Sequence, residues 1–168
     1  MDIANAEPLA IAPGWRREGQ SLLVCDSRCR LEQATATNGT AEAVLIAERA
    51  NLPSLRWTLR LSERGLEMEL EGAGDLALAL PVLQDDGERQ ATLRQQERTA
   101  TVEFNGWQCR WITDGTLVDT GTVVANRNGH YRRLEARGQG HLNVRIVLEP
   151  APKAALTVNE ESNPRSAS

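Results

Sequence analysis

The sequence predicts an all-β protein: an antiparallel β-sandwich of two sheets, built from about ten to twelve short strands. Apolar residues recur at every second position through most of the chain, which is the period of a half-buried strand. Clusters of Gly, Asn, Asp, Ser and Pro divide these stretches at a spacing typical of antiparallel meanders. No segment shows a convincing helical period, and no fixed repeat indicates a propeller or a solenoid.

Length and composition indicate one domain. The 168 residues are 40% hydrophobic and 25% charged, which is ordinary for a globular chain with a substantial core. Both ends are rich in Ala, Pro and polar residues. We therefore expect a flexible lead-in over residues 1–13, the β-sandwich domain over 14–150 and a disordered tail over 151–168.

The strands of the first half begin at Trp15, where alternation sets in. Asn38-Gly39 is a strong signal for a two-residue hairpin turn. Residues 41–48 have a helical alternative, but their apolar centre and the strands on both sides favour a buried strand.

The clearest hairpin joins residues 55–61 to residues 66–70, because both stretches alternate apolar and polar side chains. Its polar face sets Arg56 and Arg60 opposite a row of glutamates at 67, 69 and 71. Cross-strand pairs of opposite charge contribute roughly 0.2–1 kcal/mol each. We interpret these glutamates as a solvated strand face and not as a metal site.

The second half is predicted from its turn residues. Residues 72–75 predict a turn, and the strand over 76–83 is expected to end at Pro81 or to lie at a sheet edge. Asn105-Gly106 predicts a hairpin that leads into a strand with Trp107, Cys109 and Trp111 on one face. The last strand pair is expected around residues 138–140.

Charge and motifs exclude several classes of function. The net charge is −4 with a pI near 5.3, which argues against a broad cationic surface for nucleic acid. The chain contains no phosphate-binding loop, dinucleotide fingerprint, zinc-protease, serine-hydrolase or calcium-loop motif, so we expect no cofactor. No stretch is apolar for long enough to span a membrane.

The localisation stays open at this stage. The first residues have no basic segment followed by a long apolar core, so they do not predict a secretory signal. We expect either a cytoplasmic protein or a piece of a longer precursor, which would be extracellular or periplasmic.

Three cysteines, Cys25, Cys29 and Cys109, give an odd count. Neither His130 nor His141 falls at a zinc-ligand spacing from them, so we expect no metal site. Buried free thiols are the favoured state, and a Cys25–Cys29 bridge across a tight turn is the alternative in an oxidising compartment.

The candidate site is a polar loop. Asn126, Arg127, Asn128, His130 and Tyr131 offer amide, guanidinium, imidazole and phenol groups that could bind sugar hydroxyls or carboxylates. A His–Tyr pair with an Asn that neutralises a uronate would also serve a polysaccharide lyase, which abstracts a proton next to the carboxylate. The alternative is a turn in which Asn128-Gly129 supplies positive φ and the side chains bind the backbone.

The tryptophans and two aspartates are weaker candidates. Most of the four Trp fall on apolar strand faces and are expected in the core, whereas Trp15, after Pro13-Gly14, is kept as a surface aromatic for stacking on sugar. Asp114 and Asp119 flank one short segment and could form a carboxylate pair for glycoside hydrolysis, although both have turn contexts.

One segment, WQCRWITDGTLVDTGTVVANRNGHYRRLEARGQGHLNVRIVLEP, carries a family resemblance. It resembles the β-sandwich region near the C-terminus of bacterial heparinase II/III-like polysaccharide lyases and related glycan-processing enzymes. The resemblance covers residues 15–150 in architecture and about 105–150 in motif. In that family the proton-abstracting residues lie mostly in a separate helical domain, so the resemblance transfers no catalytic residue. It implies a sandwich that packs against a catalytic domain or helps to close its cleft.

The leading hypothesis is therefore a non-catalytic accessory β-sandwich domain of a bacterial polysaccharide-degrading enzyme, which contacts glycan or a neighbouring catalytic domain. One alternative is a small polysaccharide lyase or hydrolase that uses His130 and Tyr131. The other is a protein-docking module with no glycan role, which would present an apolar patch or a sheet edge. The expected partners are a polysaccharide, a catalytic domain or a partner protein, without nucleic acid.

Overall fold

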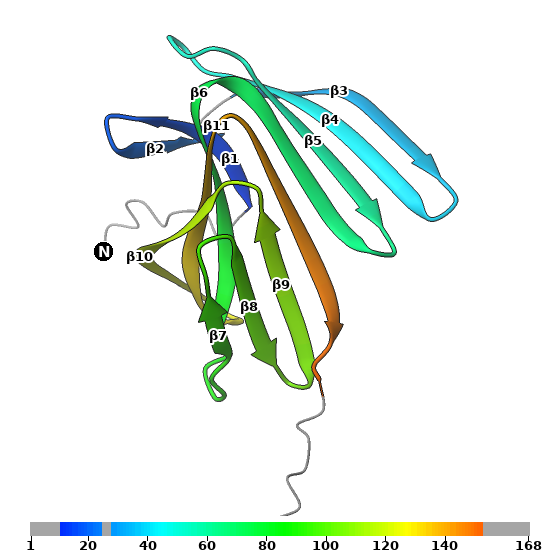
Figure 1. The fold of residues 1–168 in the computed structure, drawn as a ribbon, viewed down its shortest axis with the longest axis vertical. Helices are drawn as coiled ribbons and strands as arrows, with labels where there is room; N and C mark the ends of the chain where they lie inside the picture. The colour runs from blue at the N-terminus through cyan, green and yellow to red at the C-terminus, as the bar shows by residue number, and fades with distance from the viewer. Residues whose placement is uncertain (1–10, 25–27, 153–168) are drawn as a thin grey trace, which may run out of the picture.

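The computed structural model describes residues 11–24 and 28–152, which form β-strands and connecting turns with no α-helix among them (Figure 1). The strands are β1 (Ala12–Arg17), β2 (Gln20–Leu23), β3 (Arg28–Thr37), β4 (Thr40–Glu48), β5 (Leu55–Ser62), β6 (Gly65–Asp85), β7 (Thr92–Gln95), β8 (Thr99–Phe104), β9 (Trp107–Thr113), β10 (Thr116–Asn126) and β11 (Gly129–Pro150). All pairings are antiparallel. The predicted all-β class and strand number are confirmed.

The strands form two layers that share β6 and β11. The first layer has the order β2-β1-β6-β11-β10, using residues 75–85 of β6 and the N-terminal half of β11. The second layer has the order β3-β4-β5-β6-β11-β9-β8-β7, using the other half of each shared strand. The hydrogen-bonded sheet is therefore continuous, and its two parts enclose one core.

The shared strands change layer at glycines. Gly74 of β6 and Gly140 of β11 both have positive φ, 87° and 71°, and the register between the two strands shifts between Gln139 and His141. Gly138 has no space for a side chain, since a Cβ there would lie 2.6 Å from the His141 carbonyl oxygen. Figure 1 shows both strands curving through this region, which we call the crease (residues 72–75 of β6 and 138–141 of β11).

Side chains from both layers fill the core. Leu76, Leu78 and Leu80 of β6 are fully buried on the first layer, and Met68 and Leu70 of the same strand are fully buried on the second. They belong to one cluster with residues from seven further strands, including Trp15, Leu55, Val102, Trp111, Leu117, Leu134 and Val144. The apolar side chains that alternate along the strands thus point into the space between the layers, as the sequence predicts.

The predicted hairpins are confirmed in register. Thr37 pairs with Thr40 around Asn38-Gly39, and Phe104 pairs with Trp107 around Asn105-Gly106. Residues 41–48 lie in strand β4, which confirms the strand interpretation over the helical alternative. In the β5–β6 hairpin Arg56 pairs with Glu71 and Arg60 with Glu67, as the charge pattern predicts.

Two predicted turns are absent, and one of two alternatives for Pro81 is wrong. Residues 72–75 and 138–140 are not turns, because β6 and β11 run through them as single bent strands. The strand was expected either to end at Pro81 or to lie at a sheet edge there. It continues to Asp85, with Arg133 of β11 opposite the proline, so the first of these alternatives is wrong. Among the described residues the β1–β6 pairing stops at Ala79, so β11 is the one described strand beside Pro81, which fits the sheet-edge alternative.

The predicted lead-in and tail lie largely outside the described residues. Ala12 and Pro13, at the end of the predicted lead-in, already belong to β1. No helix in the described ranges is long and apolar enough to cross a membrane.

Candidate functional site

The predicted loop is the turn between β10 and β11. Asn126 pairs with Gly129, which leaves Arg127 and Asn128 exposed at the tip. The Asn126 Oδ1 atom accepts a hydrogen bond of 2.7 Å from the backbone N–H of Asn128. Gly129 has a φ of 133°, and a Cβ there would lie 2.0 Å from the Asp85 carbonyl oxygen. These contacts fit the turn alternative, and glycan binding by this loop stays a prediction.

His130 and Tyr131 follow the turn but do not converge. They are successive residues of β11 in regular register with β10, opposite Ala125 and Val124, so their side chains point to opposite faces. His130 is half exposed, and its Nδ1 atom lies 2.7 Å from Asp85 Oδ1. Proton abstraction that needs both groups at one substrate atom is therefore not supported by this geometry.

Two aspartates at the end of β6, Asp85 and Asp86, lie next to the β10–β11 turn. The hydrogen bond with His130 lowers the pKa of Asp85. Asp86 accepts hydrogen bonds from the backbone N–H and guanidinium of Arg89 and from the backbone N–H of Glu88, and they lower its pKa to about 2. The Arg89 guanidinium also lies 5.1 Å from the centre of the Phe104 ring. The Asp85 and Asp86 carboxylates thus both form hydrogen bonds with nearby residues.

Trp15 is not a surface aromatic, and that prediction is wrong. Its side chain is 2% exposed because β1 pairs with β6 and turns Trp15 toward the core, beside Leu76. Trp111 is buried as expected, whereas Trp107, at the start of the same strand, is 52% exposed. Sequence alternation placed both on one face, but only part of that face is covered by the first layer.

The uncovered part of this face forms an apolar surface. A hollow of about 430 Å³ lies at the ends of β3, β4, β5 and β6, and Figure 1 shows these hairpin ends projecting from the rest of the molecule. Its apolar lining is Ala34, Ala36, Ala41, Ala43, Leu59, Leu61 and Leu66. Leu61 is 56% exposed, and Leu148 of β11 is 65% exposed. We call the hollow together with Leu148 and Trp107 the open apolar surface.

The opposite face of the second layer carries a charge network, of which the sequence predicted the arginine–glutamate row but not the parts contributed by Glu42, His141 and Asp114. Arg60 donates from Nε to Glu42 and from Nη1 to Glu69, each at 2.8 Å. Glu69 Oε1 lies 3.1 Å from His141 Nε2, and His141 Nδ1 lies 3.2 Å from Asp114 Oδ2. The network thus crosses β4, β5, β6 and β11 and reaches the turn after β9.

These contacts alter two ionisation equilibria. The hydrogen bonds from Arg60 and then His141 lower the pKa of Glu69. The hydrogen bonds to Glu69 and then Glu42 raise the pKa of Arg60. The alternation of Arg56 and Arg60 with the glutamates correctly predicted the charged face of the β5–β6 hairpin. The sequence did not predict that His141 joins this face, because it assigned His141 to a separate strand pair.

The two aspartates proposed as a hydrolase pair have separate partners. Asp114 binds His141 and accepts a hydrogen bond from the backbone N–H of Asn143, whereas Asp119 binds Arg132 at 2.9 Å. Each carboxylate is held by a different part of β11, so the geometry provides no shared cleft for them.

The cysteines differ from one another. Cys25, one partner of the possible Cys25–Cys29 bridge, lies outside the described residues. Cys29 is exposed, so the expectation of a buried thiol is wrong there, because β3 is an edge strand. Burial raises the pKa of Cys109 to about 11. Nowhere in residues 11–24 and 28–152 do three or more His, Cys, Asp or Glu side chains gather to hold a metal ion.

Comparison with known proteins gives a likeness in structure. No family model matches the chain, and no curated protein matches it in sequence. The heparan sulfate lyase HepC from Pedobacter heparinus matches 76% of this chain with a TM-score of 0.56 at 10% identity. A heparinase III structure matches 74% with a TM-score of 0.55 at 11% identity. The predicted likeness to the heparinase group is thus confirmed as a likeness of fold.

The match covers only part of those enzymes. In both structures this chain spans 22% of the length.

Proposed function

We propose that this chain is an accessory β-sandwich domain of a polysaccharide-lyase-type enzyme. In this proposal it does not catalyse cleavage itself but packs against a catalytic domain, on the same polypeptide or on a partner chain, and contacts glycan. The observation that carries the proposal is that this fold resembles a part of heparan sulfate lyase and of heparinase III that makes up 22% of each chain. A portion of that size fits one structural domain of a multidomain enzyme.

The open apolar surface supports the docking part of the proposal. Large exposed apolar patches on soluble proteins often mark a contact with another surface. Here Leu61, Leu148 and Trp107 are all more than half exposed on the face that elsewhere forms the core. The second layer extends beyond the first, so the open apolar surface is available for contact with a catalytic domain.

A lyase assay on two preparations tests the proposal. Heparan sulfate and polygalacturonate are incubated with the purified chain and, separately, with material immunoprecipitated from source cells by an antibody against this chain. Product is followed by the ultraviolet absorbance of unsaturated uronates. We expect product from the precipitated material and none from the purified chain.

The two other outcomes favour the alternatives. Product released by the purified chain, and lost in the His130→Ala and Tyr131→Phe variants, would establish a small lyase and overturn the accessory role. Absence of lyase activity from both preparations would leave a docking module without a role in glycan cleavage.

A further inference from the structure

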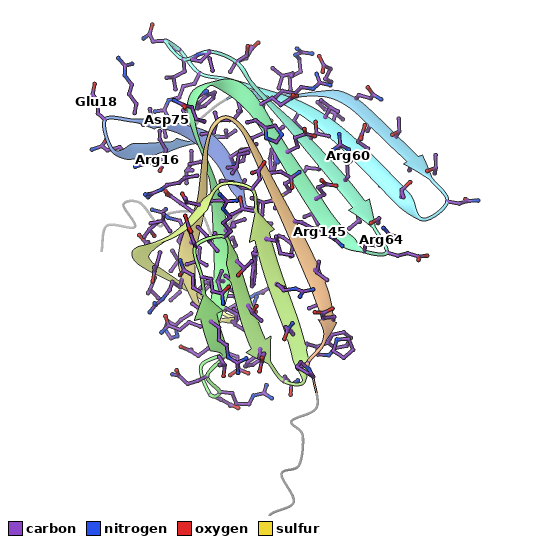
Figure 2. All side chains as sticks on the ribbon, viewed as in Figure 1. Arg16, Glu18, Arg60, Arg64, Asp75 and Arg145 are labelled. Atoms are coloured by element: carbon purple, nitrogen blue, oxygen red, sulfur yellow. The ribbon has the colours of Figure 1, made fainter. Side chains whose placement is uncertain are left out.

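A second hollow lies on the charged face of the second layer, at the turn between β5 and β6. Its volume is about 220 Å³, and its lining is Arg60, Ser62, Arg64, Gly65, Leu66, Glu67 and Arg145. Figure 2 labels the three arginines on β5, on the β5–β6 turn and on β11. We call it the arginine hollow. It lies on the face opposite the core, away from the β10–β11 turn.

Backbone packing explains why these arginines meet. Arg60, Glu67 and Arg145 are register partners across β5, β6 and β11, so they form one row on one face. Gly65 has a φ of 119°, and a Cβ there would lie 2.0 Å from the Ile146 carbonyl oxygen. The turn that carries Arg64 is therefore pressed against β11 directly beside Arg145.

The three guanidinium groups differ in their partners. Arg60 is held by Glu42 and Glu69, which orient its fork and leave donors on Nη2. Arg64 and Arg145 are exposed, and within the described part of the chain their side chains have no hydrogen-bond or ion-pair partner. Glu67 is the one acidic side chain in the lining, and its Oε1 atom accepts a hydrogen bond from Asn143 Nδ2.

We propose that the arginine hollow binds the sulfate or carboxylate groups of an acidic polysaccharide. A guanidinium group presents paired N–H donors that match the oxygens of these anions, and such charge-assisted hydrogen bonds are roughly twice as strong as neutral ones. Arg64 and Arg145 supply two exposed guanidinium groups that form no ion pair with any carboxylate of the described chain. The inference rests on the proposed function for its choice of a polysaccharide as the source of the anions.

Affinity measurements on the intact chain test the site. Binding to heparan sulfate, dextran sulfate, polygalacturonate and neutral dextran is measured by isothermal titration calorimetry for the wild type and for an Arg64→Ala/Arg145→Ala double variant. We expect at least one acidic polymer to bind and the double variant to lose about tenfold or more in affinity, as the loss of charged hydrogen bonds implies. Neutral dextran should not bind, and added salt should weaken binding because exposed charges are screened.

The polymers also identify the anion. Binding of dextran sulfate without polygalacturonate assigns the hollow to sulfate, and the reverse result assigns it to carboxylate. Both replaced side chains are exposed and lack partners, so the thermal midpoint should not change, and an unchanged midpoint shows that the double variant is folded.

Two matched variants serve as controls. Arg94→Ala removes an exposed arginine that is paired with Glu103, and Arg127→Ala removes the arginine at the β10–β11 turn. Unchanged affinity in both, beside a loss in the double variant, supports the arginine hollow. A loss in Arg127→Ala alone would overturn the inference and place the glycan at the turn, with the proposed function intact. Absence of binding to every acidic polymer would overturn it as well, while the lyase assay decides the proposed function separately.

Discussion

Glu135 shows how a single residue can depart from the strand pattern. It lies on the outer face of β11, yet its side chain is only 3% exposed. Its Oε2 atom accepts hydrogen bonds from Ser21 Oγ at 2.9 Å and from Arg137 Nη2 at 3.0 Å. The register places it beside Ala79, whose small side chain leaves room for the carboxylate. A buried charge is stable only when it is paired in this way.

Replacement of Glu135 should therefore be costly. Glu135→Ala leaves the Arg137 guanidinium without its carboxylate in a mostly buried setting, and we expect a loss of about 3 kcal/mol in the free energy of unfolding. Glu103→Ala, which breaks the exposed pair with Arg94, should cost less than about 1 kcal/mol. Urea denaturation of both variants measures the difference. Equal losses would mean that the Glu135 pair is as well solvated as the surface pair.

At the scale of elements, the crease decides the architecture. β6 and β11 each contribute to both layers, so the bend at their glycines sets how the layers face one another. Positive φ at Gly74 and Gly140 is costly for other residues, and close backbone contact excludes a side chain at Gly138.

Gly138→Ala should weaken the crease. The added Cβ would meet the His141 carbonyl oxygen at 2.6 Å, so the strand must shift, and we expect a loss of about 1–3 kcal/mol in stability. Gly72→Ala, on β6 at the same crease, is the control, because its nearest neighbour is the movable end of the Leu55 side chain at 3.1 Å. Thermal unfolding should show the larger drop for Gly138→Ala. A larger drop for Gly72→Ala would show that β6 and not β11 limits the bend.

At the scale of the whole molecule, stability is unevenly distributed. The β6 residues 76–80 are fully buried or nearly so, and residues 76–79 have paired strands on both sides. Among the described strands β3 pairs only with β4, and its residues from Cys29 to Thr37 are exposed. Local opening is therefore easier at β3 than at the shared strands.

Amide hydrogen exchange followed by mass spectrometry should reproduce this order. We expect residues 76–80 of β6 and the buried positions of β11 to exchange slowest, and β3 to exchange among the fastest strands. The measurement is made at low protein concentration and repeated at high concentration. Protection of β3 that equals that of β6 at both concentrations would contradict the order, whereas protection only at high concentration would indicate pairing of the exposed edge between copies.

Alternation and turn residues alone determined the all-β class, the confirmed two-residue hairpins and the charged face of the β5–β6 hairpin. These features depend on contacts between residues close in the chain, where side-chain period and backbone conformation act directly. The placement of the loop at residues 126–131 also followed from its turn chemistry.

Tertiary structure decided the rest. Glycines at 72–74 and 138–140 have the same local preference in a turn as in a bent strand, and only the pairing of β6 with β11 selects the bend. Trp15 was expected at the surface but is buried, because β1 pairs with β6 in the first layer. Trp107 was expected in the core but is exposed, because the first layer does not cover its end of β9. The Arg60–Glu69–His141 network and the arginine hollow join residues more than 70 positions apart. Such contacts follow from how the layers are joined, which no local pattern encodes.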